Sequence, residues 1–357
     1  MSRTLNSFAR RAAGFGLIEV LVGLVIGMLA VIVILQVAAL SEARKRTTTS
    51  GGYAQSNGAI MFYRLQRSIA QAGYGLNSNT LFKCDTVWKV DSGSDIATKI
   101  PLAPVTINPG SSIIPAGDPN TDTLLVMSGN TNGEPQGNPI NSSSEEGYKV
   151  QMPGAFAAGD RVIAAPSGCS STLRLDKVAS VTSNTVKTSS SAAGATLYNL
   201  GPAPTIQAYA VRGGNLTVCD YLVNDCGLQD PPSILNDSSI WVPVATNIVS
   251  MRALYGRDTD ADCVVNTYDQ TAPGNSQDVA NISAIDLVLV ARSGQYEKDA
   301  VTTATSNPPA WAGDSIAPLI GETGNLGPGE DWKHYRYKVF QSVVPIRNVV
   351  WMGAECP

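Results

Sequence analysis

The hydrophobic pattern of this chain is dominated by one apolar stretch, which runs from Gly14 to Leu40. The 21 residues from Phe15 to Leu35 include a single polar side chain, that of Glu19. About 20 apolar residues in a helix are needed to cross the hydrocarbon core of a bilayer. No comparable stretch follows in the sequence. The pattern therefore predicts a membrane-spanning helix over residues 15–40.

Beyond this stretch the pattern becomes that of an amphipathic helix that packs on a domain. Apolar side chains recur at steps of three and four residues: Ile60, Met61, Leu65, Ile69 and Ala72. Gly51-Gly52 is a possible break, and Gly73-Tyr74-Gly75 is a stop signal. The sequence thus predicts a long N-terminal helix over residues 15–75, with its first part in the membrane.

From residue 76 the chain is expected to be rich in β-strands, because short apolar or alternating runs are separated by Gly, Pro and Asn clusters. Six such runs are expected as strands: Asp122–Met127, Asp160–Ala165, Ile206–Val211, Leu216–Val218, Ile285–Ala291 and Tyr335–Val344. Residues 247–255 fit a strand or a helical turn, and residues 129–147 and 303–330 are expected as surface loops. The expected fold class is α+β, with a large antiparallel β-rich globular head over 76–357.

Composition adds little to this picture. Hydrophobic residues make up 43% of the 357 residues and charged residues 15%, which is ordinary for a folded protein of low charge. The net charge is −4, and no basic stripe follows residue 46. The composition therefore argues against a nucleic-acid partner.

The cysteines indicate an oxidising compartment, because an even number of them lies entirely beyond the apolar stretch. They are Cys84, Cys169, Cys219, Cys226, Cys263 and Cys356. All six are disulfide candidates, and the sequence leaves their pairing open, although Cys219 and Cys226 are close enough to staple a local loop. The absence of a Cys-x-x-Cys pair and a histidine count of one argue against a zinc site.

The residues before the apolar stretch do not form an ordinary secretory signal. Residues 1–13 carry three arginines and no acid, as in a cytoplasmic basic leader. Small residues up to Gly14 precede the apolar stretch instead of following it. A cut at this point would remove the leader and leave the helix on the mature protein.

The segment from Gly14 to Glu19, GFGLIE, resembles the class III signal of type IV prepilins and type II secretion pseudopilins. In that family a prepilin peptidase cuts after the glycine and methylates the new N-terminal residue. The resemblance implies that the leader over 1–14 is removed between Gly14 and Phe15, and that Phe15 is methylated. It also places Glu19 at the fifth mature position, with a role in assembly and processing.

The position of Glu19 also has a physical meaning of its own. A carboxylate inside a membrane helix costs about 2.5–3.5 kcal/mol on insertion scales, so it usually has a partner. Cleavage would create an α-amine on Phe15, one helical turn away. The pair could close within one chain or between neighbouring chains, and the resemblance implies the second. The alternative is a plain signal-anchor with an accidental glutamate.

Further segments look like PilW-type minor pilins: Gly159–Ile163, Ala208–Val211, Asn247–Gly256, Tyr335–Phe340 and Pro345–Asn348. This resemblance implies a non-enzymatic minor pilin that helps to initiate type IV pilus assembly and stays at or near the pilus tip. The implied partners are prepilin peptidase, other minor pilins, the major pilin and a tip adhesin. The implied location is the inner membrane, with the head in the periplasm, and then the cell-surface pilus.

Two alternatives remain at this point. The first is a type II secretion pseudopilin of the J type, which has the same N-terminus. The second is a membrane-anchored adhesive or ligand-binding head. The tryptophans Trp241, Trp311, Trp332 and Trp351 could build such a surface, although side chains of this type are more often in the core of a β-rich domain.

One acidic segment has the spacing of a calcium loop, whose oxygen ligands stand at positions 1, 3, 5, 7, 9 and 12. These positions would be filled by Asp258, Asp260, Asp262, the carbonyl of Val264, Asn266 and Asp269. The segment resembles the calcium loops of dockerins, but Cys263 stands where a glycine usually allows the sharp turn. Calcium is the one cofactor expected, and a solvated acidic turn between strands is the alternative.

The sequence holds no recognisable set of catalytic residues. The single histidine, His334, lies among aromatic residues and is expected on a strand face. No nucleophile elbow, phosphate-binding glycine loop or Ser/His/Asp set is recognisable. The protein is therefore expected not to be an enzyme.

Overall fold

A computed structural model describes residues 16–349, apart from 303–330 and short gaps at 77, 79, 92, 132–133, 135, 145–146, 167, 170, 190–193, 261 and 263. The chain divides into two units, residues 1–50 and residues 51–357, each of which is described by itself. The expected leader and Phe15 lie outside the described residues.

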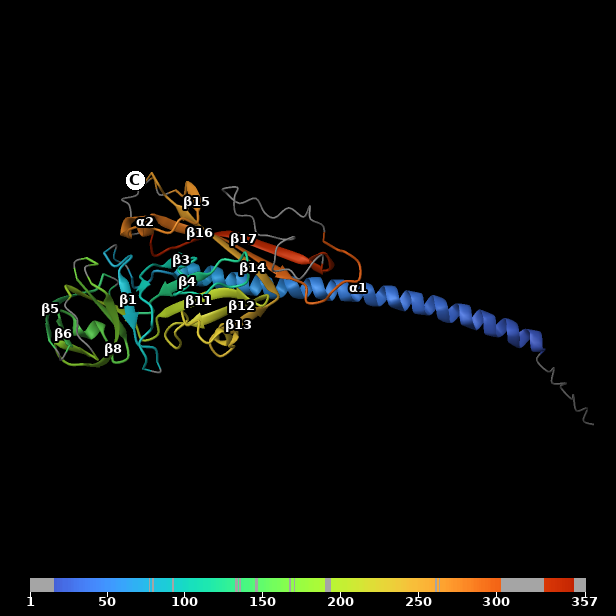
Figure 1. Ribbon diagram of the computed structural model, residues 1–357, viewed down its shortest axis with the longest axis horizontal. Helices are drawn as coiled ribbons and strands as arrows, with labels where there is room; N and C mark the ends of the chain where they lie inside the picture. Colours follow the sequence, from blue (N-terminus) through green and yellow to red (C-terminus); the bar gives the residue numbers. More distant parts are fainter. Residues whose placement is uncertain are drawn as a thin grey trace, which may run out of the picture. The chain divides into compact units, whose positions relative to one another are not determined.

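The first unit contains the N-terminal part of helix α1, which spans Leu17–Gln71 in one piece (Figure 1). Residues Leu17–Glu42 have a mean hydropathy of 3.0 and are long and apolar enough to cross a membrane. Gly51-Gly52 does not break α1, which corrects the expected break. A glycine costs only about 1 kcal/mol in a helix interior, and here the helix is held by its packed C-terminal part.

The second unit, the head, begins with that packed part of α1. Met61, Leu65 and Ile69 are buried in the main core, which confirms the predicted apolar stripe. Ile60 is 55% exposed, so its assignment to the stripe was wrong. The buried positions repeat every four residues from Met61, and Ile60 lies about 100° away from them around the helix.

The end of α1 is fixed by backbone contacts that the glycines allow. Gly73 and Gly75 have φ angles of 82° and 77°, in the left-handed region that glycine adopts without strain. The Gly73 N–H donates a hydrogen bond of 2.8 Å to the carbonyl of Met127. The predicted stop at Gly73-Tyr74-Gly75 is therefore confirmed, since α1 ends at Gln71.

Two antiparallel sheets make up the main body of the head. The five-stranded sheet has the order β13-β12-β11-β4-β3, and the four-stranded sheet has the order β15-β14-β16-β17. Their bounds are β3 Val105–Ile107, β4 Leu124–Ser128, β11 Thr205–Arg212, β12 Asn215–Asp220, β13 Val242–Thr246, β14 Ile248–Arg257, β15 Thr267–Asp269, β16 Ile282–Arg292 and β17 Tyr337–Pro345.

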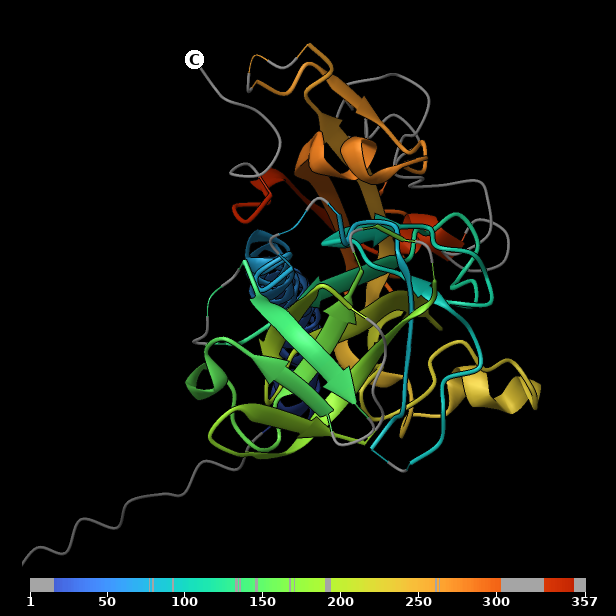
Figure 2. The same ribbon diagram turned by 90° about the vertical axis from the view of Figure 1, so that its left-hand side faces the viewer.

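A third sheet closes on itself. Its order is β2-β1-β8-β7-β10-β5-β6-β9, and an additional pairing of β8 with β9 joins six of these strands into a ring. The bounds are β1 Asp85–Trp88, β2 Ile100–Pro101, β5 Asn138–Ser144, β6 Gly147–Val150, β7 Arg161–Ala165, β8 Leu173–Val181, β9 Thr185–Thr188 and β10 Thr196–Gly201. Figure 2 shows its green strands in front of the other sheets. We call the segment from β5 to β10, which contains the six strands of the closed ring, the β-ring.

The β-ring is an insertion with a core of its own. It lies between β4 and β11, which are antiparallel neighbours in the five-stranded sheet. Tyr148, Phe156, Val186 and Leu197 belong to a buried cluster separate from the main core. The expected loop over 129–147 is corrected in part, because β5 occupies 138–144. Its polar residues Asn-Pro-Ile-Asn-Ser-Ser-Ser resemble loop composition, and the pairing with β6 and β10 makes them a strand.

The remaining elements are short. They are the helix α2, Ser276–Ala280, and the 3₁₀ helices η1 Pro153–Ala155, η2 Pro232–Asn236 and η3 Asp331–His334. Of residues 247–255, for which a strand or a helical turn was expected, all but Asn247 belong to strand β14, which begins at Ile248. His334 ends η3, directly before β17, so the expected strand-face position was wrong. The expected loop over 303–330 lies outside the described residues.

The six predicted strands coincide with β4, β7, β11, β12, β16 and β17, with ends shifted by a few residues. Together with α1 these strands confirm the predicted α+β class with an antiparallel β-rich head. Trp241 and Trp332 are buried at 2% and 3% exposure, as the core interpretation predicts. Trp311 and Trp351 lie outside the described residues.

Candidate functional site

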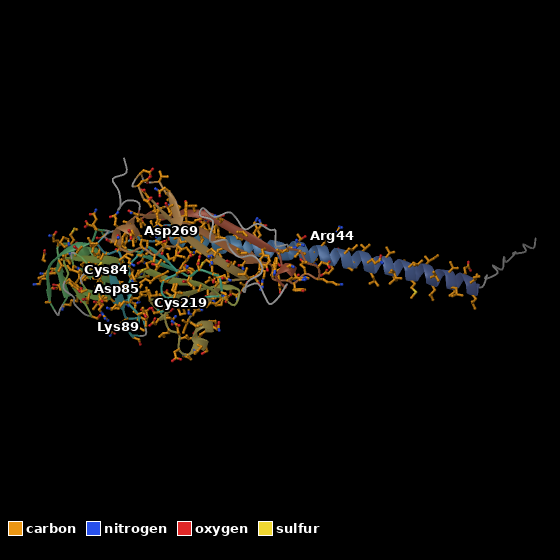
Figure 3. All side chains as sticks on the ribbon, turned by 45° about the horizontal axis from the view of Figure 1, so that its top comes forward. Arg44, Cys84, Asp85, Lys89, Cys219 and Asp269 are labelled. Atoms are coloured by element: carbon orange, nitrogen blue, oxygen red, sulfur yellow. A yellow bond between two sulfur atoms is a disulfide. The ribbon has the colours of Figure 1, made fainter. Side chains whose placement is uncertain are left out.

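The first candidate site is the exposed surface of α1 in the N-terminal unit. Leu17 and Ile18 are 80% and 76% exposed, and the most apolar window of Leu17–Glu42 has none of its residues buried. Figure 3 shows side chains standing out from all sides of this part of the helix. An apolar surface of this size needs a bilayer or other apolar helices around it.

Glu19 is the only acidic residue in the first turn of α1, where it is exposed. A carboxylate is favoured at a helix N-terminus, because the first N–H groups of the helix are unpaired and carry partial positive charge. Gly14 and Phe15 lie outside the described residues, so the predicted cleavage and methylation remain predictions.

The second candidate site is the acidic loop between β14 and β15. Each of Asp258, Asp260 and Asp262 offers a carboxylate oxygen, and these oxygens lie within 4.8 Å of one another. Asp260 Oδ1 accepts a hydrogen bond of 2.8 Å from Asn266 Nδ2. Asp262 Oδ1 accepts one of 2.8 Å from the Val264 N–H. The structure therefore brings together three of the six expected ligands.

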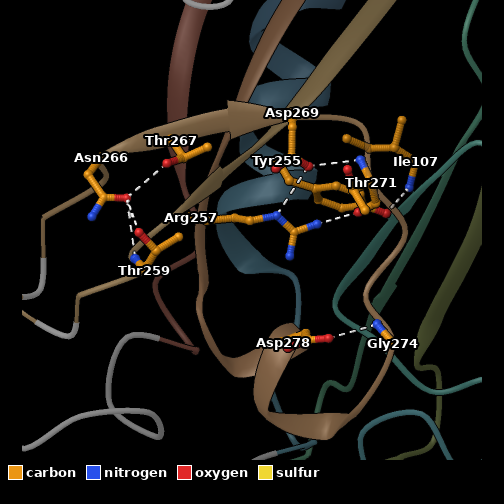
Figure 4. A network of polar contacts seen from close by, with 10 residues as sticks. All are labelled: Ile107, Tyr255, Arg257, Thr259, Asn266, Thr267, Asp269, Thr271, Gly274 and Asp278. Atoms are coloured by element: carbon orange, nitrogen blue, oxygen red, sulfur yellow. Dashed lines mark hydrogen bonds and ion pairs between the residues drawn. The ribbon is translucent and has the colours of Figure 1, made fainter.

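The other two side chains of the expected ligand set face different partners. Asp269 Oδ1 lies 3.2 Å from Nε of Arg257 and also accepts a hydrogen bond of 2.8 Å from the Thr271 N–H (Figure 4). Asn266 Oδ1 accepts a hydrogen bond of 2.9 Å from the Thr259 hydroxyl. A calcium ion with all six ligands would require both oxygens to turn. Calcium binding remains a prediction, and Cys263 lies outside the described residues.

Four of the six candidate cysteines form the two disulfides found among the described residues of the head. Cys84 pairs with Cys169, and Cys219 pairs with Cys226. The second pair is the local staple that the spacing suggests, and the first joins residues that are 85 positions apart, beside β1 and before β8. Cys263 and Cys356 lie outside the described residues.

A buried carboxylate at the junction of the two main sheets was not found from the sequence. Asp122 is 3% exposed and accepts hydrogen bonds from Asn108 Nδ2, the Ala253 N–H and Gln270 Nε2 at 2.9, 2.9 and 2.7 Å. Burial raises the pKa of Asp122, and the Arg252 guanidinium, 3.4 Å away, opposes that rise. An acid at the start of a strand gives no sequence signal for this degree of burial.

His334 has a structural environment. Its Nδ1 lies 2.8 Å from the carbonyl oxygen of Glu297. Its ring stacks on Tyr296, with centroids 4.6 Å apart and planes 12° apart. These contacts hold the turn that leads into β17.

The structure thus combines an apolar N-terminal helix with an antiparallel β-rich head, and one comparison with known proteins identifies a family that part of the head resembles. Residues 228–348 match the model of the family Type IV Pilus-assembly protein W, PilW. These residues, which include β13 to β17, are similar to that family, and the PilW resemblance of the segments Asn247–Gly256, Tyr335–Phe340 and Pro345–Asn348 is confirmed. Comparisons with curated proteins and with solved structures give no match.

The family match has two consequences. It relates residues 228–348 to a family that is named for type IV pilus assembly. It also excludes the β-ring from the matched region, because the ring ends at Gly201 and the match begins at residue 228. The β-ring therefore lies in the part of the head that the family match does not cover, together with the packed end of α1, β1 to β4, β11 and β12.

Proposed function

We propose that this protein is a minor pilin that helps to initiate type IV pilus assembly and is incorporated at or near the pilus tip. The observation that carries the proposal is the exposed apolar helix Leu17–Glu42, which belongs to the same α1 as the packed segment of a head that matches the PilW family. A bilayer covers that helix first, and neighbouring pilin helices replace the lipid on assembly.

In this proposal the first turn of α1 sets the register between subunits. Prepilin peptidase removes residues 1–14 and methylates Phe15, which leaves an α-amine next to an apolar helix. Glu19 offers a carboxylate to the α-amine of a neighbouring chain. In an apolar surrounding the two charges attract strongly, and an unpaired carboxylate is costly, so one axial offset between helices is favoured.

The proposal includes a location and a set of partners. The protein is held in the inner membrane by a single span with its head in the periplasm, and then moves to the cell-surface pilus. Its partners are prepilin peptidase, other minor pilins, the major pilin and a tip adhesin. The two disulfides support a head outside the cytoplasm, because such bonds persist in oxidising compartments. We propose no enzymatic activity.

The proposal is tested by counting pili on cells in which the gene is deleted and then restored. Loss of pili on deletion and recovery with the wild-type gene are expected. Glu19→Ala should fail to restore pili, whereas Glu42→Ala, at the end of the apolar segment, should restore them and serves as the matched control. Normal piliation of the deletion strain overturns the proposal. If protein secretion fails while pili persist, the J-type pseudopilin is the correct alternative.

A second candidate function, a ligand-binding head, is favoured by the β-ring. A hollow of about 480 Å³ lies between Phe156, Asp160 and Asn199 of the ring and Asn130 and Thr131, which precede it. Asn199 Nδ2 already donates hydrogen bonds of 2.8 Å to Asp160 Oδ2 and to the carbonyl of Ala155. Glycan-array binding by the full-length protein in detergent tests this candidate, and a blank array rejects it for glycans.

We also propose calcium as a ligand of the acidic loop. The proposal is supported by three carboxylates that converge within 4.8 Å, since like charges at this distance repel one another unless a cation screens them. A bound ion would hold together the loop between β14 and β15. It would have no role in the packing of helix α1 against other pilin helices.

A further inference from the structure

Three hollows surround the C-terminal end of α1 in the head, and they share lining residues. The first, of about 350 Å³, lies against β11 to β13 and is lined by Arg64 and Arg67. The second, of about 400 Å³, lies against the end of β17 and is lined by Arg67 and Arg347. The third, of about 470 Å³, lies past the helix end and is lined by Arg347 and Asn348. Gln71 lines all three. We call them together the arginine groove.

The fold brings the three arginines together from distant parts of the chain. Arg64 and Arg67 are three residues apart on α1, so they share one face, while Leu65 and Ile69 point into the core. Arg347 follows β17 and is held beside the helix end by its neighbour Asn348. The Asn348 amide donates hydrogen bonds to carbonyl oxygens of the last helical turn.

Among the described residues of the head, no carboxylate pairs with the arginines of the groove. Arg64, Arg67 and Arg347 are all exposed. No Asp or Glu is among the described residues that line the three hollows. Five other arginines of the described head face a carboxylate at 2.8–3.4 Å, namely Arg161, Arg174, Arg252, Arg257 and Arg336. On a protein of net charge −4, three arginines that face no carboxylate of the described residues form a cationic groove, which favours an anionic ligand.

The lining between the arginines favours a polypeptide as the anion. Tyr63 and Val343 line the groove and are 65% and 46% exposed, so apolar surface alternates with charge. Arginine and tyrosine beside small apolar pockets are typical of protein interfaces. Duplex nucleic acid is bound instead by many cations that follow a regular phosphate backbone.

We propose that the arginine groove binds an acidic polypeptide segment of a neighbouring pilus subunit, a proposal that rests on the proposed function. Carboxylates of the partner would pair with Arg67 and Arg347, and its apolar side chains would lie against Tyr63 and Val343. Arginine pairs with carboxylates through two parallel hydrogen bonds, which gives the contact a defined orientation. Complementary charge of this kind sets partner choice and register more than raw affinity.

The first test is photo-crosslinking of the full-length protein in its membrane. A photoreactive amino acid is placed at Gln66, which lines the groove beside Arg67, and the crosslinked peptide is identified by mass spectrometry. The expected product is a segment of another pilus subunit that contains several Asp or Glu residues. Crosslinks to a neutral or basic segment, to nucleic acid, or to a second copy of this chain overturn the proposal.

The second test compares two pairs of charge reversals in the full-length protein. Arg67→Glu with Arg347→Glu should reduce co-purification of the crosslinked subunit about tenfold, and added salt should have the same effect on the wild type. Lys149→Glu with Lys177→Glu changes the net charge equally at exposed positions of the β-ring and should leave co-purification unchanged. If both double variants co-purify equal amounts of the crosslinked subunit, the proposal is overturned.

These outcomes separate the groove from the proposed function. If deletion of the gene abolishes pili but the groove variant assembles pili and retains its partners, the groove proposal fails and the minor-pilin function stands. If deletion leaves pili intact, the function fails. The crosslinked peptide then shows whether the groove binds an acidic polypeptide at all.

Discussion

The side-chain amide of Asn348 caps the C-terminal end of α1, where it donates hydrogen bonds of 3.0 Å to the Gln71 carbonyl and 3.1 Å to the Ala72 carbonyl. The two ends of the head, 277 residues apart in sequence, are joined by this contact. The last carbonyls of a helix have no partner within the helix, so an outside donor satisfies them.

Asn348→Ala should therefore destabilise the head. The loss of two hydrogen bonds, one exposed and one partly buried, costs about 1–2 kcal/mol. In a head of this size that corresponds to a fall in Tm of about 2–4 °C for each kcal/mol. The measurement is thermal unfolding of the full-length protein in detergent, followed by tryptophan fluorescence. Asn236→Ala, at an exposed position, is the control, and equal Tm values for the two variants would contradict the cap.

The two disulfides should be recovered as linked peptides. Mass spectrometry of unreduced digests should show Cys84 joined to Cys169 and Cys219 joined to Cys226. In the chain-entropy model, loss of these bonds costs about 4.6 and about 2.5 kcal/mol, the larger value for the longer loop. The Cys84→Ser/Cys169→Ser variant should thus lower the Tm more than the Cys219→Ser/Cys226→Ser variant. Any other pairing of these four cysteines refutes the assignment.

Asp122 should make the head less stable as the pH rises. Its pKa is raised in the folded state by burial, so above the unfolded pKa of about 3.9 the unfolded chain ionises first. Stability is then lost between that pH and the folded pKa. The free energy of unfolding of the wild type minus that of Asp122→Asn should fall as the pH rises through this window. Asp85→Asn, at an exposed position, controls for the loss of one charge, and a rising difference for Asp122 would contradict the sign.

Calcium should raise the Tm of metal-free protein if the acidic loop binds it. A ligand at 100 times its Kd stabilises the folded state by about 2.7 kcal/mol. Asp260→Ala should abolish the response because it removes one of three converging carboxylates, whereas Asp237→Ala, at an exposed turn outside the loop, should retain it. A wild-type Tm that does not move with calcium ends the proposal.

Replacement of Gly14 by a bulky residue should block removal of the leader. The resemblance to class III signals implies that the peptidase cuts directly after this glycine. Immunoblots of cells that carry Gly14→Trp should show only the longer precursor, and Ala12→Trp tests whether bulk nearby is enough. A Gly14→Trp protein that migrates like the mature wild type would refute the cleavage site.

Much of the architecture could be predicted from local sequence pattern. An apolar run of this length with one carboxylate, at Glu19, is stable mainly as a helix that is surrounded by lipid or by other apolar helices. Short apolar runs such as Ile285–Ala291 became strands, and the glycines after Gln71 ended the helix. These features could be predicted because each depends on residues that are close together in the sequence. The segment with the most polar pattern, Asn138–Ser144, was missed because only its partners β6 and β10 make it a strand.

The sequence alone determined the apolar N-terminal helix, the β-rich class of the head and the PilW resemblance. The tertiary structure decided the closed β-ring, the pairing of Cys84 with Cys169, the burial of Asp122 and the groove shared by Arg67 and Arg347. The reason is that these features join residues far apart in the chain. Periodicity shows which face of an element is apolar, but it does not show which distant element covers that face or which charges are left without a partner.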